Sequence, residues 1–238
     1  MMDLRYLWLF ILPFIGGVIA LSIRTADKNV LKLFLAFSGA FLFSITVIDI
    51  LPSLYQNNLT SKIGFFILAG FFFQIILEYF TKGIEHGHLH HIHNRNRIPL
   101  TIIIGLCLHS FIEGMPMSNI GFLTPEQRNN LIYGVALHEA PAAFTLITLL
   151  RHNRTSNLST FLILLIYSCM SLVGIYSSNL LSNFEFFTPQ ILQDILAIVV
   201  GTFLHISTTI LFENSENHSF SRFKLVAIII GVGLALLL

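Results

Sequence analysis

Long apolar runs alternate with short polar connections along the 238-residue chain. Most runs approach the roughly 20 residues that a helix needs to cross a bilayer. In lipid a spanning segment must satisfy its own backbone, so the runs are predicted to be helices. The expected fold class is all-α, a polytopic membrane helical bundle of eight transmembrane helices in a single domain over residues 1–238. The predicted spans are Leu7–Ile23, Val30–Leu51, Ile63–Phe80, Ile98–Ile120, Leu131–Leu150, Leu158–Ser177, Ile191–Phe212 and Phe223–Leu238.

Composition agrees with a membrane protein. Hydrophobic residues make up 55% of the chain and charged residues only 11%, where a soluble domain has about 25%. The net charge of +1 gives no electrostatic reason to expect nucleic acid as a partner. The two cysteines, Cys107 and Cys169, lie in apolar runs and predict neither a disulfide framework nor a cysteine-rich zinc site.

The basic residues are distributed unevenly between the two sides of the predicted bundle. Ten of the 13 lie on the side of the first, third, fifth and seventh connections, which the positive-inside rule makes cytoplasmic. Both termini are then outside, and we expect the protein in the plasma (inner) membrane of a bacterium. The ten are Arg24, Lys28, Lys32, Lys82, Arg95, Arg97, Arg151, Arg154, Arg222 and Lys224.

A weak internal repeat links the second and seventh spans. Gly39–Leu42 followed by Thr46 resembles Gly201–Leu204 followed by Thr208 at the same offsets. These spans would run in opposite directions. The pattern therefore predicts two inverted three-helix units around helices 4 and 5, a common transporter plan, although small-residue helix packing produces similar patterns.

The fourth span carries polar residues at helical spacing. His109, Glu113 and Met117 follow at intervals of four and share one helix face, with Ser110 beside them. A carboxylate at membrane depth costs about 2.5–3.5 kcal/mol, which a divalent cation would offset. Imidazole, carboxylate and thioether are ligands for transition metals. Pro116 is expected to free a carbonyl near the site. The alternative is a hydrogen-bonded pair that joins two helices.

The fifth span repeats the theme with His138, Glu139 and Pro141. Adjacent residues diverge by about 100° around a helix, so His138 and Glu139 cannot both face one point without distortion. We expect Pro141 to break the helix and supply that distortion. The segment partly matches the His-Glu-x-x-His pattern of zinc proteases, but Ala142 occupies the position of the second histidine.

Together the two motifs resemble the ZIP (Zrt/Irt-like) family of divalent metal transporters. The order His-Ser-Phe-Ile-Glu-Gly and then His-Glu-Ala-Pro is similar to the paired motifs of that family. The resemblance implies ligand roles for His109, Glu113, His138 and Glu139. Ser110 stands where the family often has Asn, Ala142 where many members have a bridging ligand, and Asp49 where helix 2 often has His. We therefore expect one principal ion, with Asp49 either nearby or an interfacial acid.

The third connection, residues 81–97, is expected to be cytoplasmic and is rich in histidine. Such a tract can bind divalent metal in several interchangeable ways, or its composition can be incidental to a solvated loop. We favour a regulatory metal contact, because a flexible loop cannot fix the geometry of a transport site. Its histidines are His86, His88, His90, His91 and His93.

The sequence thus predicts a transporter and not an enzyme. It is expected to move a divalent transition metal, zinc first and iron or manganese as alternatives, toward the cytoplasm. The expected partners are the metal ion as transported substrate and the lipid bilayer, with no separate cofactor, and a homodimer is the assembly to test for. The rival interpretations are an intramembrane metal-dependent hydrolase and a metal-sensing membrane protein that does not transport.

Overall fold

The computed structural model describes residues 4–23, 28–56, 61–86, 98–119, 123–212 and 222–237, and these residues form helices with no strand. Three short turns accompany the main helices: Leu4–Tyr6, Ile84–His86 and Met115–Met117 are 3-10 helices. The α-helices are α1 (Leu7–Ser22), α2 (Lys28–Ile45), α3 (Leu51–Gln56), α4 (Ser61–Thr81), α5 (Leu100–Gly114), α6 (Pro125–His152), α7 (Asn157–Leu181), α8 (Pro189–Phe212) and α9 (Arg222–Leu236).

Within the described ranges, seven helical segments are long and apolar enough to cross a membrane, so the polytopic helical bundle is confirmed. The second of them is continuous from α2 through a π-helical stretch, Thr46–Ile50, into α3. The eighth predicted span corresponds to α9, whose 15 described residues give about 22 Å of helix. That length is less than the roughly 30 Å of a bilayer core, which is why α9 does not qualify with the other seven.

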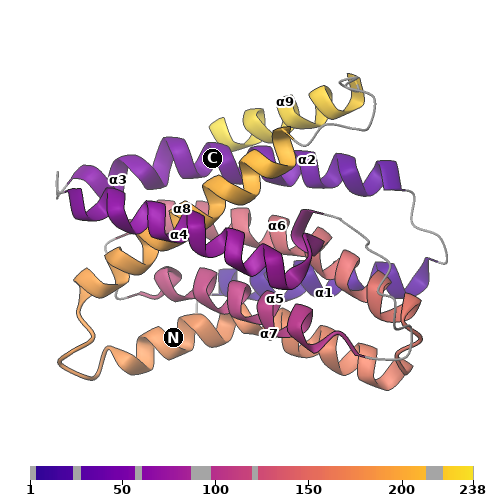
Figure 1. The fold of residues 1–238 in the computed structure, drawn as a ribbon. Coiled ribbons are helices and arrows are strands. Elements are labelled where there is room, and N and C mark those ends of the chain that lie inside the picture. The colour runs from indigo at the N-terminus through magenta and orange to yellow at the C-terminus, as the bar shows by residue number, and fades with distance from the viewer. Residues whose placement is uncertain are drawn as a thin grey trace.

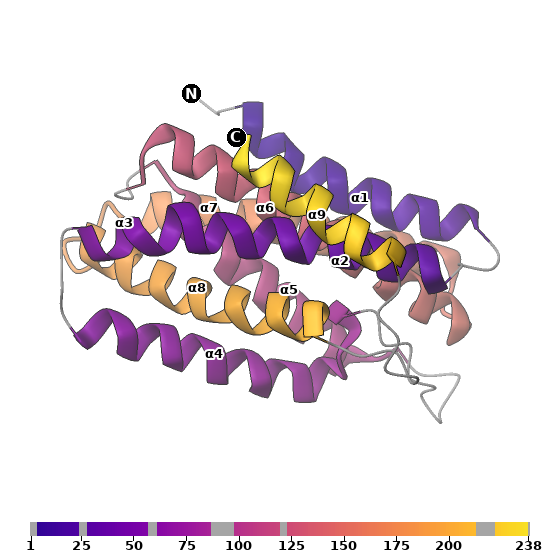
Figure 2. The same ribbon diagram turned by 90° about the horizontal axis from the view of Figure 1, so that it is seen from above.

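The helices pack as two groups (Figures 1 and 2). In the first group α1 lies along α6 and α5 lies along α7, and in the second α4 lies along α8 and α2 lies along α9. Contacts of α2 with α6 and of α4 with α5 join the two groups. An inverted repeat would exchange α1, α2 and α4 with α7, α8 and α9, and α5 with α6. This exchange converts the α1–α6 pair into the α7–α5 pair. It also converts the α4–α8 pair into the α9–α2 pair. This pairing is consistent with inverted three-helix units around α5 and α6.

Glycines allow very close helix approaches in the first group. A Cβ at Gly16 of α1 would lie 2.3 Å from the carbonyl oxygen of Ala140 in α6. A Cβ at Gly174 of α7 would lie 2.1 Å from the carbonyl oxygen of Phe111 in α5. Contacts this short are available only to glycine, and small residues at helix interfaces are the usual route to tight packing in lipid. These approaches hold α6 against α1 and α5 against α7.

Two backbone expectations at the prolines are wrong. Helix α6 is continuous through Pro141 and does not break there. Proline removes one amide donor, which a well-packed membrane helix can tolerate, and α1 approaches closely at the adjacent Ala140. The carbonyl of Ile112 is also not freed by Pro116, because the amide of Met115 donates to it as α5 tightens into a 3-10 turn.

Candidate metal site

Three of the predicted ligands come together inside the bundle. His109 and Glu113 lie on α5 and His138 lies on α6, and at most 3% of each residue is exposed. One ligand atom from each lies within 4.8 Å of the others. We call these three residues the His/Glu cluster. Among the described residues it is the group of His, Cys, Asp and Glu side chains arranged to hold a metal ion.

The helix repeat explains the geometry on α5. His109 and Glu113 are one turn apart, and Nε2 of His109 lies 2.9 Å from Oε1 of Glu113. The imidazole of His138 faces that of His109 from α6, with ring centroids 6.1 Å apart and the planes nearly perpendicular. The edge-on arrangement brings a second imidazole to the side of the cluster that α5 does not cover.

The dimensions of the cluster suit a small divalent ion. Zinc binds nitrogen and oxygen at about 2.0–2.2 Å, so tetrahedral ligand atoms lie about 3.3 Å from one another. An ion entering between His109 and Glu113 would widen their 2.9 Å contact by roughly 0.4 Å. Two imidazoles and a carboxylate form the mixed nitrogen and oxygen donor set that zinc, iron and manganese accept. Such small movements are within the reach of side-chain rotation.

Glu139 points to a different place from its neighbour His138. It is fully buried, and its Oε1 accepts a hydrogen bond of 2.6 Å from the hydroxyl of Ser171 on α7. The hydroxyls of Ser110 and Ser171 are 2.9 Å apart. This divergence is what the 100° step between adjacent helix residues predicts. Glu139 therefore lies outside the His/Glu cluster, in a carboxylate–serine network formed by α5, α6 and α7.

Ser171 is a site residue that the sequence reading missed. Its position depends on the α5–α7 approach, because a Cβ at Gly114 would lie 2.0 Å from the carbonyl oxygen of Ser171. The available signal was the spacing of Ser171, Gly174 and Ser178, which marks a small-residue face on an apolar helix. That spacing predicts close packing, but it does not identify the carboxylate on the neighbouring helix.

Asp49 lies away from the cluster. Its half-buried carboxylate accepts a 2.8 Å hydrogen bond from the side-chain amide of Asn130 on α6. Asn130 precedes His138 by eight residues, or about 12 Å along the helix axis. Asp49 sits in the π-helical stretch of the second span, a feature often found at functional positions. The pair thus lies toward the end of α6 that follows residue 124.

Met117 does not join the His/Glu cluster. Met117 is buried in the 3-10 turn beyond α5, where it joins the main apolar core and its carbonyl accepts a 3.0 Å hydrogen bond from Tyr6. It therefore does not continue the regular α-helical face of His109 and Glu113. The side chains of His86, His88, His90, His91 and His93 lie outside the described part of the chain.

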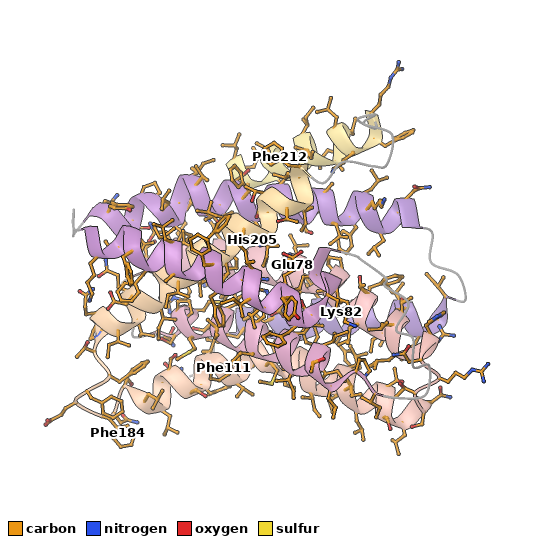
Figure 3. The ribbon with its side chains drawn as sticks, in the orientation of Figure 1. Glu78, Lys82, Phe111, Phe184, His205 and Phe212 are labelled. Carbon is orange, nitrogen blue, oxygen red and sulfur yellow. The ribbon has the colours of Figure 1, made fainter. Side chains whose placement is uncertain are left out.

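His205 of α8 contacts a neighbouring helix, α4. Its Nε2 lies 3.6 Å from Oε2 of Glu78 on α4, and Figure 3 shows the two side chains between these helices. The ring of His205 also packs edge-on against Phe71, with centroids 5.0 Å apart. These contacts give His205 a role in joining α4 to α8.

Comparison with known families gives one match over most of the site-bearing region. The family model described as ZIP Zinc transporter matches residues 82–238, which is more than half of the chain. The matched region includes the His/Glu cluster, Glu139 and Ser171. No individual curated protein matches the chain.

Proposed function

The chain belongs to the ZIP family of zinc transporters, and from this premise we propose that it carries zinc toward the cytoplasm through the His/Glu cluster. The observation that supports the proposal is the burial of His109, Glu113 and His138 around one point inside membrane-spanning helices. A buried carboxylate beside two imidazoles is costly without a partner charge, and a divalent ion supplies one.

We propose a single principal ion at this position. Ala142 offers no ligand one turn after His138, and Glu139 is engaged by Ser171. Three protein ligands leave at least one coordination position for water, as at zinc sites that exchange ligands. An incompletely saturated site suits a carrier, because the ion must leave as well as bind. Iron and manganese remain alternatives to zinc, since the same donor set accepts them.

The inward direction and the location are part of the proposal. The excess of Lys and Arg on the connections after the odd-numbered spans supports a cytoplasmic position for those connections and an external position for both termini. We place the protein in the plasma membrane of a bacterium. Apolar side chains on the outer face of α4, such as Phe65, Leu68 and Phe72, are exposed on the bundle and would contact lipid.

The rival hydrolase interpretation gains no support from the site. A metal-dependent hydrolase needs a carboxylate positioned to activate a metal-bound water. Glu139, the carboxylate next to a ligand histidine, is directed to Ser171 of α7 instead. Glu113 is itself within 2.9 Å of His109 and is needed as a ligand in the cluster.

Uptake of radiolabelled zinc into proteoliposomes tests the proposal. The native protein should accumulate zinc above empty liposomes, and His109→Ala and His138→Ala should each abolish most of this uptake. His152→Ala is the matched control, because His152 is an exposed histidine at the far end of α6. Absence of uptake by correctly folded native protein would reject the carrier, and normal uptake by both cluster variants would reject the site.

A further inference from the structure

The chain turns back into the bundle directly after α4. Lys82 and Gly83 both have positive φ, 57° and 70°, which reverses the chain at the end of the helix. Figure 3 shows Lys82 at this turn. The following 3-10 turn carries Ile84 into the apolar core formed with α5, α6 and α7, where only 2% of Ile84 is exposed. The next residue, Glu85, is thereby drawn inside the protein.

Glu85 is a buried acid whose hydrogen-bond donor in the described part of the chain is a neutral amide. Its exposed fraction is 0%, and so is that of Gln74 on α4. The side-chain amide of Gln74 donates to Oε2 of Glu85. Oε1 of Glu85 and Oε1 of Gln74 are both buried and accept no hydrogen bond. Burial of a carboxylate with one neutral donor is unfavourable, and two unused oxygens are what a cation would bind.

Gln74 and Glu85 lie close to the His/Glu cluster. The turn that carries Glu85 packs against α6 and α8. Thr81, at the end of α4, fits against Gly105, which precedes His109 by four residues or about 6 Å along α5. Ile84, next to Glu85, belongs to the same apolar cluster as Leu106, which precedes His109 by three residues. Glu85 therefore lies near the His/Glu cluster, toward the end of the bundle where α4 ends and α5 begins.

We propose that Glu85 and Gln74 form a second cation position, which receives the divalent ion as it leaves the His/Glu cluster. The carboxylate and the amide oxygen would be its protein ligands, and water would supply the rest. The inference rests on the proposed transport function and adds a step to it. Two oxygen ligands bind a transition metal more weakly than two imidazoles and a carboxylate. Weak binding suits a transit position, because conduction needs sites that the ion can leave.

Manganese binding tests the second position separately from transport. Mn²⁺ favours oxygen ligands and its bound form is measured by electron paramagnetic resonance. The background is the full chain with His109→Ala and His138→Ala, and with the five histidines of residues 86–93 changed to Asn. This background should still bind Mn²⁺ weakly, and Glu85→Gln should remove that binding. Glu185→Gln is the matched control, because Glu185 is an exposed acid in the α7–α8 connection, and it should leave the binding unchanged.

A gain-of-binding variant guards against a folding artefact. Gln74→Glu adds a second carboxylate and should tighten Mn²⁺ binding about tenfold, because ligand charge sets affinity at oxygen sites. The same variant in the otherwise native chain should slow zinc uptake by holding the ion longer. If native protein transports zinc while Glu85→Gln and Gln74→Glu leave Mn²⁺ binding unaltered, the second position is refuted and the carrier stands. If native protein transports no zinc, the carrier itself fails.

Discussion

Replacement of Gly174 by alanine should separate α5 from α7 and disturb the carboxylate–serine network. The new Cβ would lie 2.1 Å from the carbonyl oxygen of Phe111 and 3.2 Å from the amide nitrogen of Met115. Real Cβ atoms essentially never approach closer than 3.0 Å, so the Phe111 contact must lengthen by at least 0.9 Å, the difference between 3.0 and 2.1 Å. Both partners are helix backbone, and neither can relieve the clash by rotating a side chain.

The size of the effect follows from that displacement. Overpacking of this kind costs about 1–3 kcal/mol of the free energy of unfolding. Alanine gains up to about 1 kcal/mol over glycine in helix propensity, which offsets only part of the loss. Ser171 is one turn from Gly174, so a similar shift would stretch the 2.9 Å contact between the hydroxyls of Ser110 on α5 and Ser171 on α7 to about 3.8 Å, beyond a useful hydrogen bond.

The assay is thermal unfolding in detergent, together with zinc uptake in proteoliposomes. Gly233→Ala on α9 is the matched control, because a Cβ there meets nothing within 4 Å. We expect Gly174→Ala to lower the unfolding temperature and the uptake rate, and Gly233→Ala to leave both unchanged or to raise stability slightly. Equal stability of the two variants would refute the close approach of α5 and α7 and, with it, our account of how Ser171 reaches Glu139.

Three further substitutions test separate parts of the structure. Ser171→Ala should destabilise the protein by about 1–3 kcal/mol in thermal unfolding, because it leaves a buried carboxylate oxygen without this donor. Ser178→Ala is the control and should leave the stability unchanged, because the buried hydroxyl of Ser178 has no described partner. Lys82→Val should destabilise by about 1–2 kcal/mol because a β-branched residue resists positive φ, whereas Lys82→Gly should be neutral or stabilising. Ala142→Glu should tighten zinc binding in calorimetry by adding a fourth ligand one turn after His138; unchanged affinity would contradict the position assigned to that face.

The sequence predicts those features that depend on a single helix. Hydropathy identifies the spans because lipid permits little else, and the four-residue spacing of His109 and Glu113 places both on one face. The 100° step between His138 and Glu139 likewise predicts their divergence. Only the family resemblance indicated that the fourth and fifth spans form one site together. The spacing of residues within one helix does not predict which other helix lies opposite it.

The features that the sequence did not predict depend on contacts between distant segments. Ser171 lies beside Ser110 because two glycines let α5 and α7 approach, and its hydroxyl donates to Glu139 of α6. Glu85 looks like part of a solvated histidine tract, and its burial depends on the reversal at Lys82 and Gly83. Pro141 was expected to break α6, but tight packing with α1 accompanies a continuous helix. In each case tertiary packing decides between local alternatives that the sequence leaves equal.

The distribution of the two cation positions over the helix groups has a consequence for transport. The residues of the His/Glu cluster lie on α5 and α6, which pack against α7 and α1 respectively by backbone approaches that only glycine allows. A movement of this group as a unit would preserve the distances within the cluster. Gln74 belongs to α4, in the other group, whereas the turn that carries Glu85 packs against α6 as well as against α4 and α8. Displacement of one group against the other would therefore separate Gln74 from Glu85 and weaken the proposed second position without distorting the cluster, which would let an ion leave.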